Sequence, residues 1–159
     1  EVLNEAIRAC RAVGNQRLEG WARAHLTSVE HADGAHALEH DHAEAAVRLL
    51  GTSPGLRAWA LATRARAHLA ENRVDRAYED AAEAMETLEG LGGILQGETL
   101  PPLVFAQVKT RRGDADVGEA VRGAIARLER RTERLGRDDW RQKFLSLPDN
   151  KETLMLAMS

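Results

Sequence analysis

An internal repeat constrains the fold of this chain more than any other feature of its sequence. Trp21 and Trp59 lie 38 residues apart, and several small residues match at the same offset. The matched pairs are Ala22 and Ala60, Ala24 and Ala62, Ala32 and Ala70, Ala43 and Ala81, Ala46 and Ala84, and Leu50 and Leu88. A third copy at an offset of 40 places Val117, Val121, Ala124 and Leu128 on the pattern of Ala77, Ala81, Ala84 and Leu88. A period of this length, with two helices per unit, predicts a stack of helical hairpins.

Helix breakers recur between stretches in which apolar residues follow a helical spacing. Ala, Leu, Arg and Glu dominate while β-branched and aromatic residues are few, and this composition favours helix over sheet. We therefore expect an all-α chain of about eight to nine helices at 1–13, 16–32, 35–50, 54–71, 74–89, 94–112, 115–135, 139–146 and 149–158. Because Pro101-Pro102 lies inside 94–112, we expect a break near Leu100 and a second helix that restarts at Pro102.

Local signals at the helix ends support these boundaries. Ser53 followed by Pro54 predicts an N-cap and a proline in the first turn. The spacing from Asp149 to Glu152, just after Pro148, predicts a capping box. Gly90 and Gly136 are predicted to take the left-handed conformation that ends a helix.

Within residues 16–135 the chain resembles the tetratricopeptide repeat (TPR) family. The clearest repeat places Leu61, Ala65, His68, Asn72, Ala77, Ala81 and Ala84 at the family's spacing. His68 stands where an aromatic is usual, Asn72 replaces the turn glycine, Ala81 replaces a bulky residue, and Glu39 of the previous repeat stands where Ala is normal. The resemblance implies a right-handed superhelix of antiparallel hairpins in a single domain 1–159. The implied repeats are approximately 16–52, 54–90 and 94–135, with capping helices at 138–158.

The C-terminal segment extends this resemblance. Residues 139–145, 147–150 and 153–154 are similar to the closing helices of long-period, MalT-like TPR regions in large bacterial signalling proteins. Such regions belong to multidomain Ser/Thr kinases and ATP-dependent transcriptional activators. The resemblance implies a cytoplasmic scaffold or regulatory module, cut from a larger protein, that binds a partner polypeptide. The alternative it leaves open is a small-molecule-sensing domain with an enclosed cavity near Pro101-Pro102.

The first helix of each TPR hairpin lines a concave groove, and this implies a set of partner-binding residues. They are Trp21, Ala24, Ser28, Trp59, Ala62, Arg66 and Leu69, with His31 as the position of the first repeat that is equivalent to Leu69. Tryptophan and arginine are frequent binding hot spots. In the alternative interpretation, both tryptophans pack between repeats.

Other motifs point less clearly to chemistry. His36, His40 and Glu44 share one helical face and are a weak candidate metal site, because ordinary solvated histidines explain the pattern better. Cys10 has no identifiable catalytic partner, so we expect neither an enzyme nor a cofactor.

The charge and hydropathy patterns bear on partners. The basic stripe of Arg127, Arg130, Arg134, Arg137 and Arg141 is interrupted by acidic residues, and the net charge is −3, so we expect no nucleic-acid binding. No apolar run has the length of a membrane span. Leu154, Met155 and Met158 can cap the last repeat or support a homo-oligomer through the ends of the solenoid.

Overall fold

The computed structural model describes residues 1–34 and 36–158, with side chains for all of these except 36–39. Within this part there are nine α-helices and no strands, so the prediction of an all-helical chain with eight to nine helices is confirmed there. The helices are α1 (Val2–Ala12), α2 (Gln16–Ala32), α3 (His36–Leu49), α4 (Pro54–Ala70), α5 (Val74–Gly90), α6 (Leu100–Arg112), α7 (Val117–Glu133), α8 (Asp138–Leu145) and α9 (Pro148–Leu156). None of the described helices is long and apolar enough to cross a membrane.

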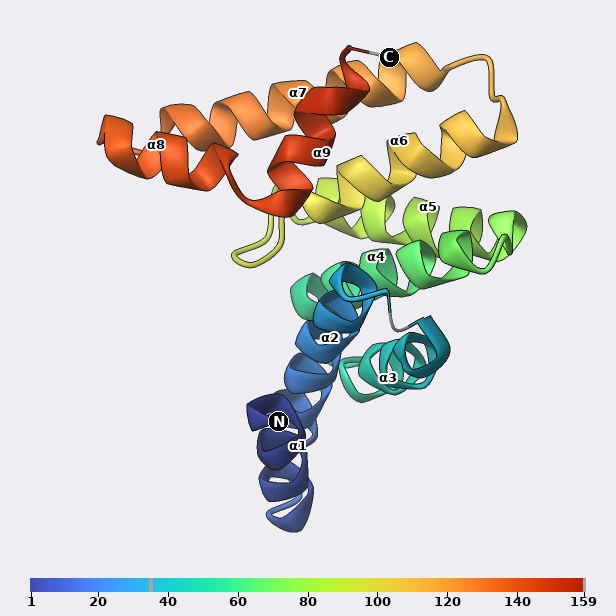
Figure 1. The fold of residues 1–159 in the computed structure, drawn as a ribbon, viewed down its shortest axis with the longest axis vertical. Coiled ribbons are helices and arrows are strands. Elements are labelled where there is room, and N and C mark those ends of the chain that lie inside the picture. The colour runs from blue at the N-terminus through green and yellow to red at the C-terminus, as the bar shows by residue number, and fades with distance from the viewer. Residues whose placement is uncertain (35, 159) are drawn as a thin grey trace.

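Successive helices pack as hairpins, and the first helices of neighbouring hairpins also touch. The hairpins are α2–α3, α4–α5 and α6–α7, and α4 contacts both α2 and α6. Figure 1 shows α9 crossing α7 and α6, against which it packs, so the end of the chain folds back over the last hairpin. The right-handed superhelix remains a prediction.

Small residues make the central hairpin tight. Ala77, Ala81, Ala84 and Leu88 are fully buried on α5, as their spacing predicts, and they pack in one core with Leu61 of α4. Their small side chains let the two helix backbones approach closely. The same core continues into α6 through Leu100, Leu103, Val104 and Val108.

A glycine serves the same purpose between α2 and α3. A Cβ atom at Gly20 would lie 2.8 Å from Leu50 Cγ and 3.0 Å from Leu49 Cβ. Since real Cβ atoms do not come this close to other carbon atoms, the hairpin requires glycine at this position.

The prediction of helix from residue 94 is wrong for residues 94–99. These residues belong to a loop that joins α5 to α6 and projects out of the layer formed by α5, α6 and α7 (Figure 1). Gly92, Gly93 and Gly97 have φ angles of +68°, +137° and +67°, which interrupt any helix. The helix begins at Leu100, not at Pro102, because both prolines occupy its first turn, where a missing N–H breaks no helical hydrogen bond.

Three predicted helix ends also differ. Ser53 holds the N-cap position and Pro54 the first turn of α4, but the serine side chain makes no capping hydrogen bond. Leu147 is the N-cap of α9 and Asp149 lies inside the helix, so the capping box is wrong. Gly90 is the last residue of α5, and Gly92 takes the left-handed conformation instead.

Gly136 does not have the positive φ predicted for it. Asn72, by contrast, has a φ of +58° at the turn between α4 and α5, where the repeat pattern places a glycine.

Candidate functional site

A cavity of about 370 Å³ lies between α2 and α4 on one side and the C-terminal helices on the other. Ser28 and His31 of α2 and Arg66 of α4 form one wall, and residues 97–99 of the loop and Arg131 of α7 form another. The third wall comes from the end of α8 and the start of α9, from Phe144 to Glu152. The cavity is therefore assembled from five segments that are far apart in the sequence.

Arg66 connects α4 to α9 at this cavity. Its side chain is 7% exposed, and its Nη1 donates to Asp149 Oδ1 at 2.7 Å. The Nε of Arg66 has no hydrogen-bond partner. A buried polar group without a partner costs about 1–3 kcal/mol, so this donor is left with an uncompensated cost.

Asn150, another residue of the cavity lining, has an unpaired acceptor instead. It is 1% exposed, and its Nδ2 donates to the Phe144 carbonyl oxygen at 2.7 Å. Its Oδ1 is buried without a partner. The cavity residues thus retain one unused donor, on Arg66, and one unused acceptor, on Asn150.

Glu98 fixes the loop against α7. Its two oxygens accept from Arg127 Nη1 at 3.1 Å and from Arg131 Nη1 at 2.9 Å, and Arg131 Nη2 donates to the Leu95 carbonyl oxygen at 3.2 Å. Farther along the basic stripe, Arg137 pairs with Asp139 and Arg141 with Asp138. Carboxylates therefore neutralise much of the predicted stripe.

The loop also covers the two tryptophans predicted at the groove. Trp59 is 5% exposed, and Gly97 lies against its ring. His25 lies between the tryptophans, with ring centroids 4.3 Å from Trp21 and 4.6 Å from Trp59. Because Trp21 Nε1 can only donate, its 2.7 Å bond to Gln96 Oε1 orients the Gln96 amide.

The orientation of the Gln96 amide determines which role the His25 ring nitrogen plays in their hydrogen bond. The Nε2 of Gln96 lies 2.7 Å from His25 Nε2 and is the donor, so the ring nitrogen accepts. Burial lowers the pKa of His25, which favours the neutral ring that this bond requires. The loop is therefore held by specific hydrogen bonds over the aromatic cluster.

The seven predicted partner-binding residues consequently separate into two groups. Ser28 and Arg66 line the cavity. Ala24, Ala62 and Trp59 are buried in the core, and Trp21 and Leu69 pack against it while partly exposed. Sequence reasoning missed Glu98, Asp149 and Asn150, and no local spacing could have identified them, because Asp149 lies 83 positions from Arg66.

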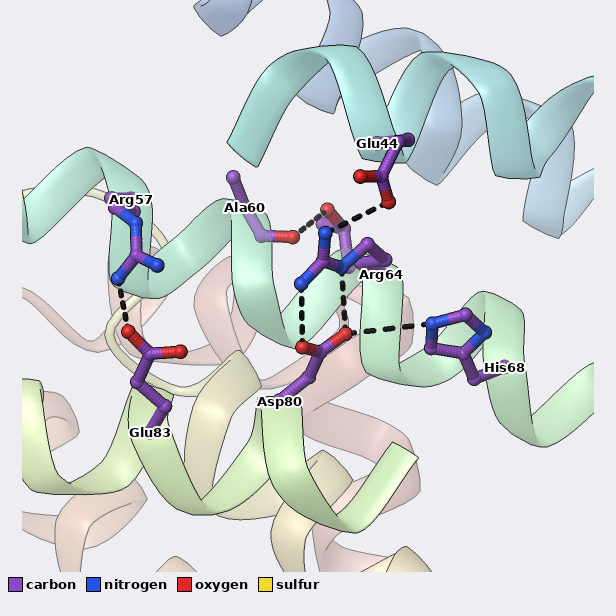
Figure 2. A network of polar contacts seen from close by, with 8 residues as sticks. Glu44, Arg57, Ala60, Arg64, His68, Asp80 and Glu83 are labelled. Atoms are coloured by element: carbon purple, nitrogen blue, oxygen red, sulfur yellow. Dashed lines mark hydrogen bonds and ion pairs between the residues drawn. The ribbon is translucent and has the colours of Figure 1, made fainter. Parts of the chain in front are cut away.

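The structure does not bring the residues of the predicted metal site together as one described cluster. The side chain of His36 lies outside the described residues. Glu44 Oε2 accepts from Arg64 Nη1 at 2.8 Å, and Arg64 also binds both oxygens of Asp80 at 2.7 Å (Figure 2). These carboxylates raise the pKa of Arg64. Glu44 therefore belongs to an ion-pair network between α3, α4 and α5.

A scan against protein-family models, a search of curated proteins and a search of solved structures each found no match to this chain. The resemblance to TPR regions consequently remains a prediction from the residues that carry it.

Proposed function

We propose that this chain is a TPR-like protein-binding module that receives a short extended segment of a partner polypeptide in the cavity between α2, α4 and α9. The observation that carries the proposal is the cavity lined by Arg66 and Asn150, two buried side chains that retain one unpaired donor (Arg66 Nε) and one unpaired acceptor (Asn150 Oδ1). A peptide group offers one carbonyl acceptor and one N–H donor. A backbone amide of the partner is therefore the simplest ligand that satisfies both.

The remaining lining of the cavity fits the same ligand. Phe144, Leu147 and Pro148 supply apolar surface, and Ser28 supplies a hydroxyl group. The volume of about 370 Å³ lies within the range of about 300–1,000 Å³ for ligand sites. Such a site holds a few residues of a polypeptide, as expected of a scaffold or regulatory module in a cytoplasmic bacterial signalling protein.

The arginines at the cavity favour binding over catalysis. Arg66 is paired with Asp149, and Arg131 with Glu98. Oppositely charged groups held in such pairs keep a fixed geometry that positions a ligand. We therefore propose a binding role and no reaction.

A small-molecule sensor is the second candidate function. The cavity is bounded by Gly97, Glu98 and Thr99, directly before the first turn of α6 that contains Pro101-Pro102. A small-molecule-sensing domain is expected to have its cavity in this region, near Pro101-Pro102. A small amide ligand would use the same donor and acceptor.

A cavity-filling variant separates these functions from a merely structural cavity. Ser28→Leu places a larger side chain on the cavity wall, and Thr87→Leu is its control on α5. Both hydroxyl groups donate to the carbonyl oxygen four residues earlier, so both variants lose the same local bond. Only Ser28 lines the cavity.

The three proteins, checked for folding by circular dichroism, are tested against a displayed library of random peptides and against a metabolite mixture by thermal shift. The peptide proposal expects peptides that bind wild type and Thr87→Leu alike and bind Ser28→Leu more than tenfold more weakly. Metabolites that stabilise wild type and Thr87→Leu, without any enriched peptide, would support the sensor. If ligands of either kind bind all three proteins equally, the cavity is not the site.

A further inference from the structure

Three side chains of metal-binding type meet at the contact between α3 and α4, away from the binding cavity. They are His40 on α3, His68 near the end of α4 and Glu71 immediately after α4, and one ligand atom from each lies within 4.8 Å of the others. Two imidazoles and one carboxylate are a donor set that binds zinc and its neighbours in the first transition series.

His68 is the most informative of the three. It is 4% exposed, and its buried Nδ1 has no hydrogen-bond partner. Its other nitrogen, Nε2, lies 3.7 Å from Asp80 Oδ2, and Figure 2 shows this carboxylate held in place by Arg64. Metal-bound histidines typically face a carboxylate with the nitrogen that does not bind the metal. The ring is thus oriented as a ligand, with Nδ1 available.

His40 lies against this ring, with the two ring centroids 5.3 Å apart. Tetrahedral zinc with bonds of about 2.0–2.1 Å separates its ligand atoms by about 3.3 Å. The three ligand atoms lie within 4.8 Å of one another, so binding a metal requires His40 and Glu71 to rotate their side chains closer to His68. Both are more exposed than His68 and have the freedom to rotate.

A cation already bridges two of these groups. The Nη2 of Arg73 lies 3.2 Å from His40 Nδ1, and the same guanidinium forms a close ion pair with Glu71. Its Nε is buried without a partner. Arg73, whose side chain is one third exposed, can swing into solvent when a metal ion replaces it.

We propose that His40, His68 and Glu71 form a structural site for Zn²⁺, in competition with the guanidinium of Arg73. The fourth position is left to water. Because His40 belongs to the first hairpin and His68 and Glu71 to the second, the ion would link neighbouring hairpins and stabilise their packing. Helical spacing groups Glu44 with His40, but Glu44 is not part of this site, because its carboxylate pairs with Arg64.

The test is calorimetric titration of the full chain with Zn²⁺ alone, with two pairs of matched variants. Glu71→Gln and Glu44→Gln each remove an exposed carboxylate that pairs with an arginine. Glu71→Gln is expected to lower the affinity about a hundredfold, since removing a direct ligand costs at least as much as removing an outer partner. Glu44→Gln should leave it unchanged. Arg73→Gln should raise the affinity at least tenfold, whereas Arg76→Gln, one turn further along in α5, should not.

A second readout keeps the proposal testable if a variant is unstable. Co²⁺ bound to wild type should give the intense visible absorption of a tetrahedral site, which His40→Ala should abolish while His42→Ala retains it. Equal Zn²⁺ affinity in Glu71→Gln and wild type, or weak octahedral Co²⁺ absorption in wild type, would overturn the proposal. So would no measurable Zn²⁺ binding by either wild type or Arg73→Gln.

Discussion

Replacing Gly97 by alanine tests whether the loop between α5 and α6 closes over Trp59. Gly97 has a φ of +67°, a conformation that costs an L-residue roughly 1–2 kcal/mol. A Cβ atom there would also come within 2.6 Å of Trp59 Nε1 and 2.8 Å of Trp59 Cγ. Since His25 and the core enclose the ring, the loop must lift away to relieve this overlap.

The magnitude follows from what the lifted loop gives up. Exposing a buried aromatic side chain costs about 1.5–3 kcal/mol. The two hydrogen bonds of Gln96 contribute about 1 kcal/mol each. Because part of this contact survives a small displacement, we expect Gly97→Ala to lower the free energy of unfolding by about 4 kcal/mol, with backbone strain included.

Gly92→Ala is the matched control in the same loop. Gly92 has a φ of +68°, but nothing lies within 4 Å of its added Cβ. It should therefore show only the backbone term of roughly 1–2 kcal/mol. Urea unfolding followed by circular dichroism measures both values, and tryptophan fluorescence should shift to the red only in Gly97→Ala. If the two variants agree within about 0.5 kcal/mol, Trp59 is not covered by the loop and the reasoning fails.

Three further predictions concern packing, an ion pair and pH. Gly20→Ala should lower the free energy of unfolding by about 1–3 kcal/mol, because the added methyl group overpacks α2 against α3. Gly123→Ala, where nothing lies within 4 Å of the added Cβ, should raise it by about 0.5–1 kcal/mol. Urea unfolding that ranks the two variants the other way would refute the close contact at Gly20. Asp149→Asn should cost about 2 kcal/mol and increase proteolysis of the C-terminal segment, because it weakens the partner of buried Arg66; unchanged cleavage would contradict this. Burial lowers the pKa of His68 from 6.5 to about 4, so the unfolded chain binds this proton more tightly and stability falls between those pH values as pH decreases. The loss in the free energy of unfolding approaches about 3 kcal/mol. Urea titrations at several pH values, with EDTA present, should show a smaller loss in His68→Phe than in wild type. An equal dependence of stability on pH in the two proteins would refute this prediction.

The sequence predicts the helices of this chain well because their ends are set locally. Most boundaries agree within two residues with those expected, since glycines, Asn72 and the prolines interrupt the apolar pattern directly. The segment 94–99 is the exception. Ile94 is buried, so its apolar character suits a helix equally well, but glycine conformations and the contact of Gly97 with Trp59 determine a loop.

The candidate sites are less predictable, because they depend on which helices meet. Periodicity along one helix groups His40 with His36 and Glu44, whereas packing brings His40 to His68 on the next hairpin. In the same way, Arg66 is identifiable as a residue of a first helix, but its partner Asp149 becomes visible only when α9 folds back. Such pairings need tertiary structure.

The two proposed sites share α4 but lie on opposite sides of it. Arg66 lines the cavity while His68 faces α3 and Asp80 of α5, and two residues along a helix correspond to a rotation of about 200°. Perturbations at separated sites without shared partners are usually additive. Glu71→Gln should therefore leave binding to the cavity unchanged, and Ser28→Leu should leave the affinity for Zn²⁺ unchanged. If instead Zn²⁺ alters ligand affinity in wild type and not in Glu71→Gln, α4 transmits a change between the two sites, and the metal acts as a regulator of the binding module.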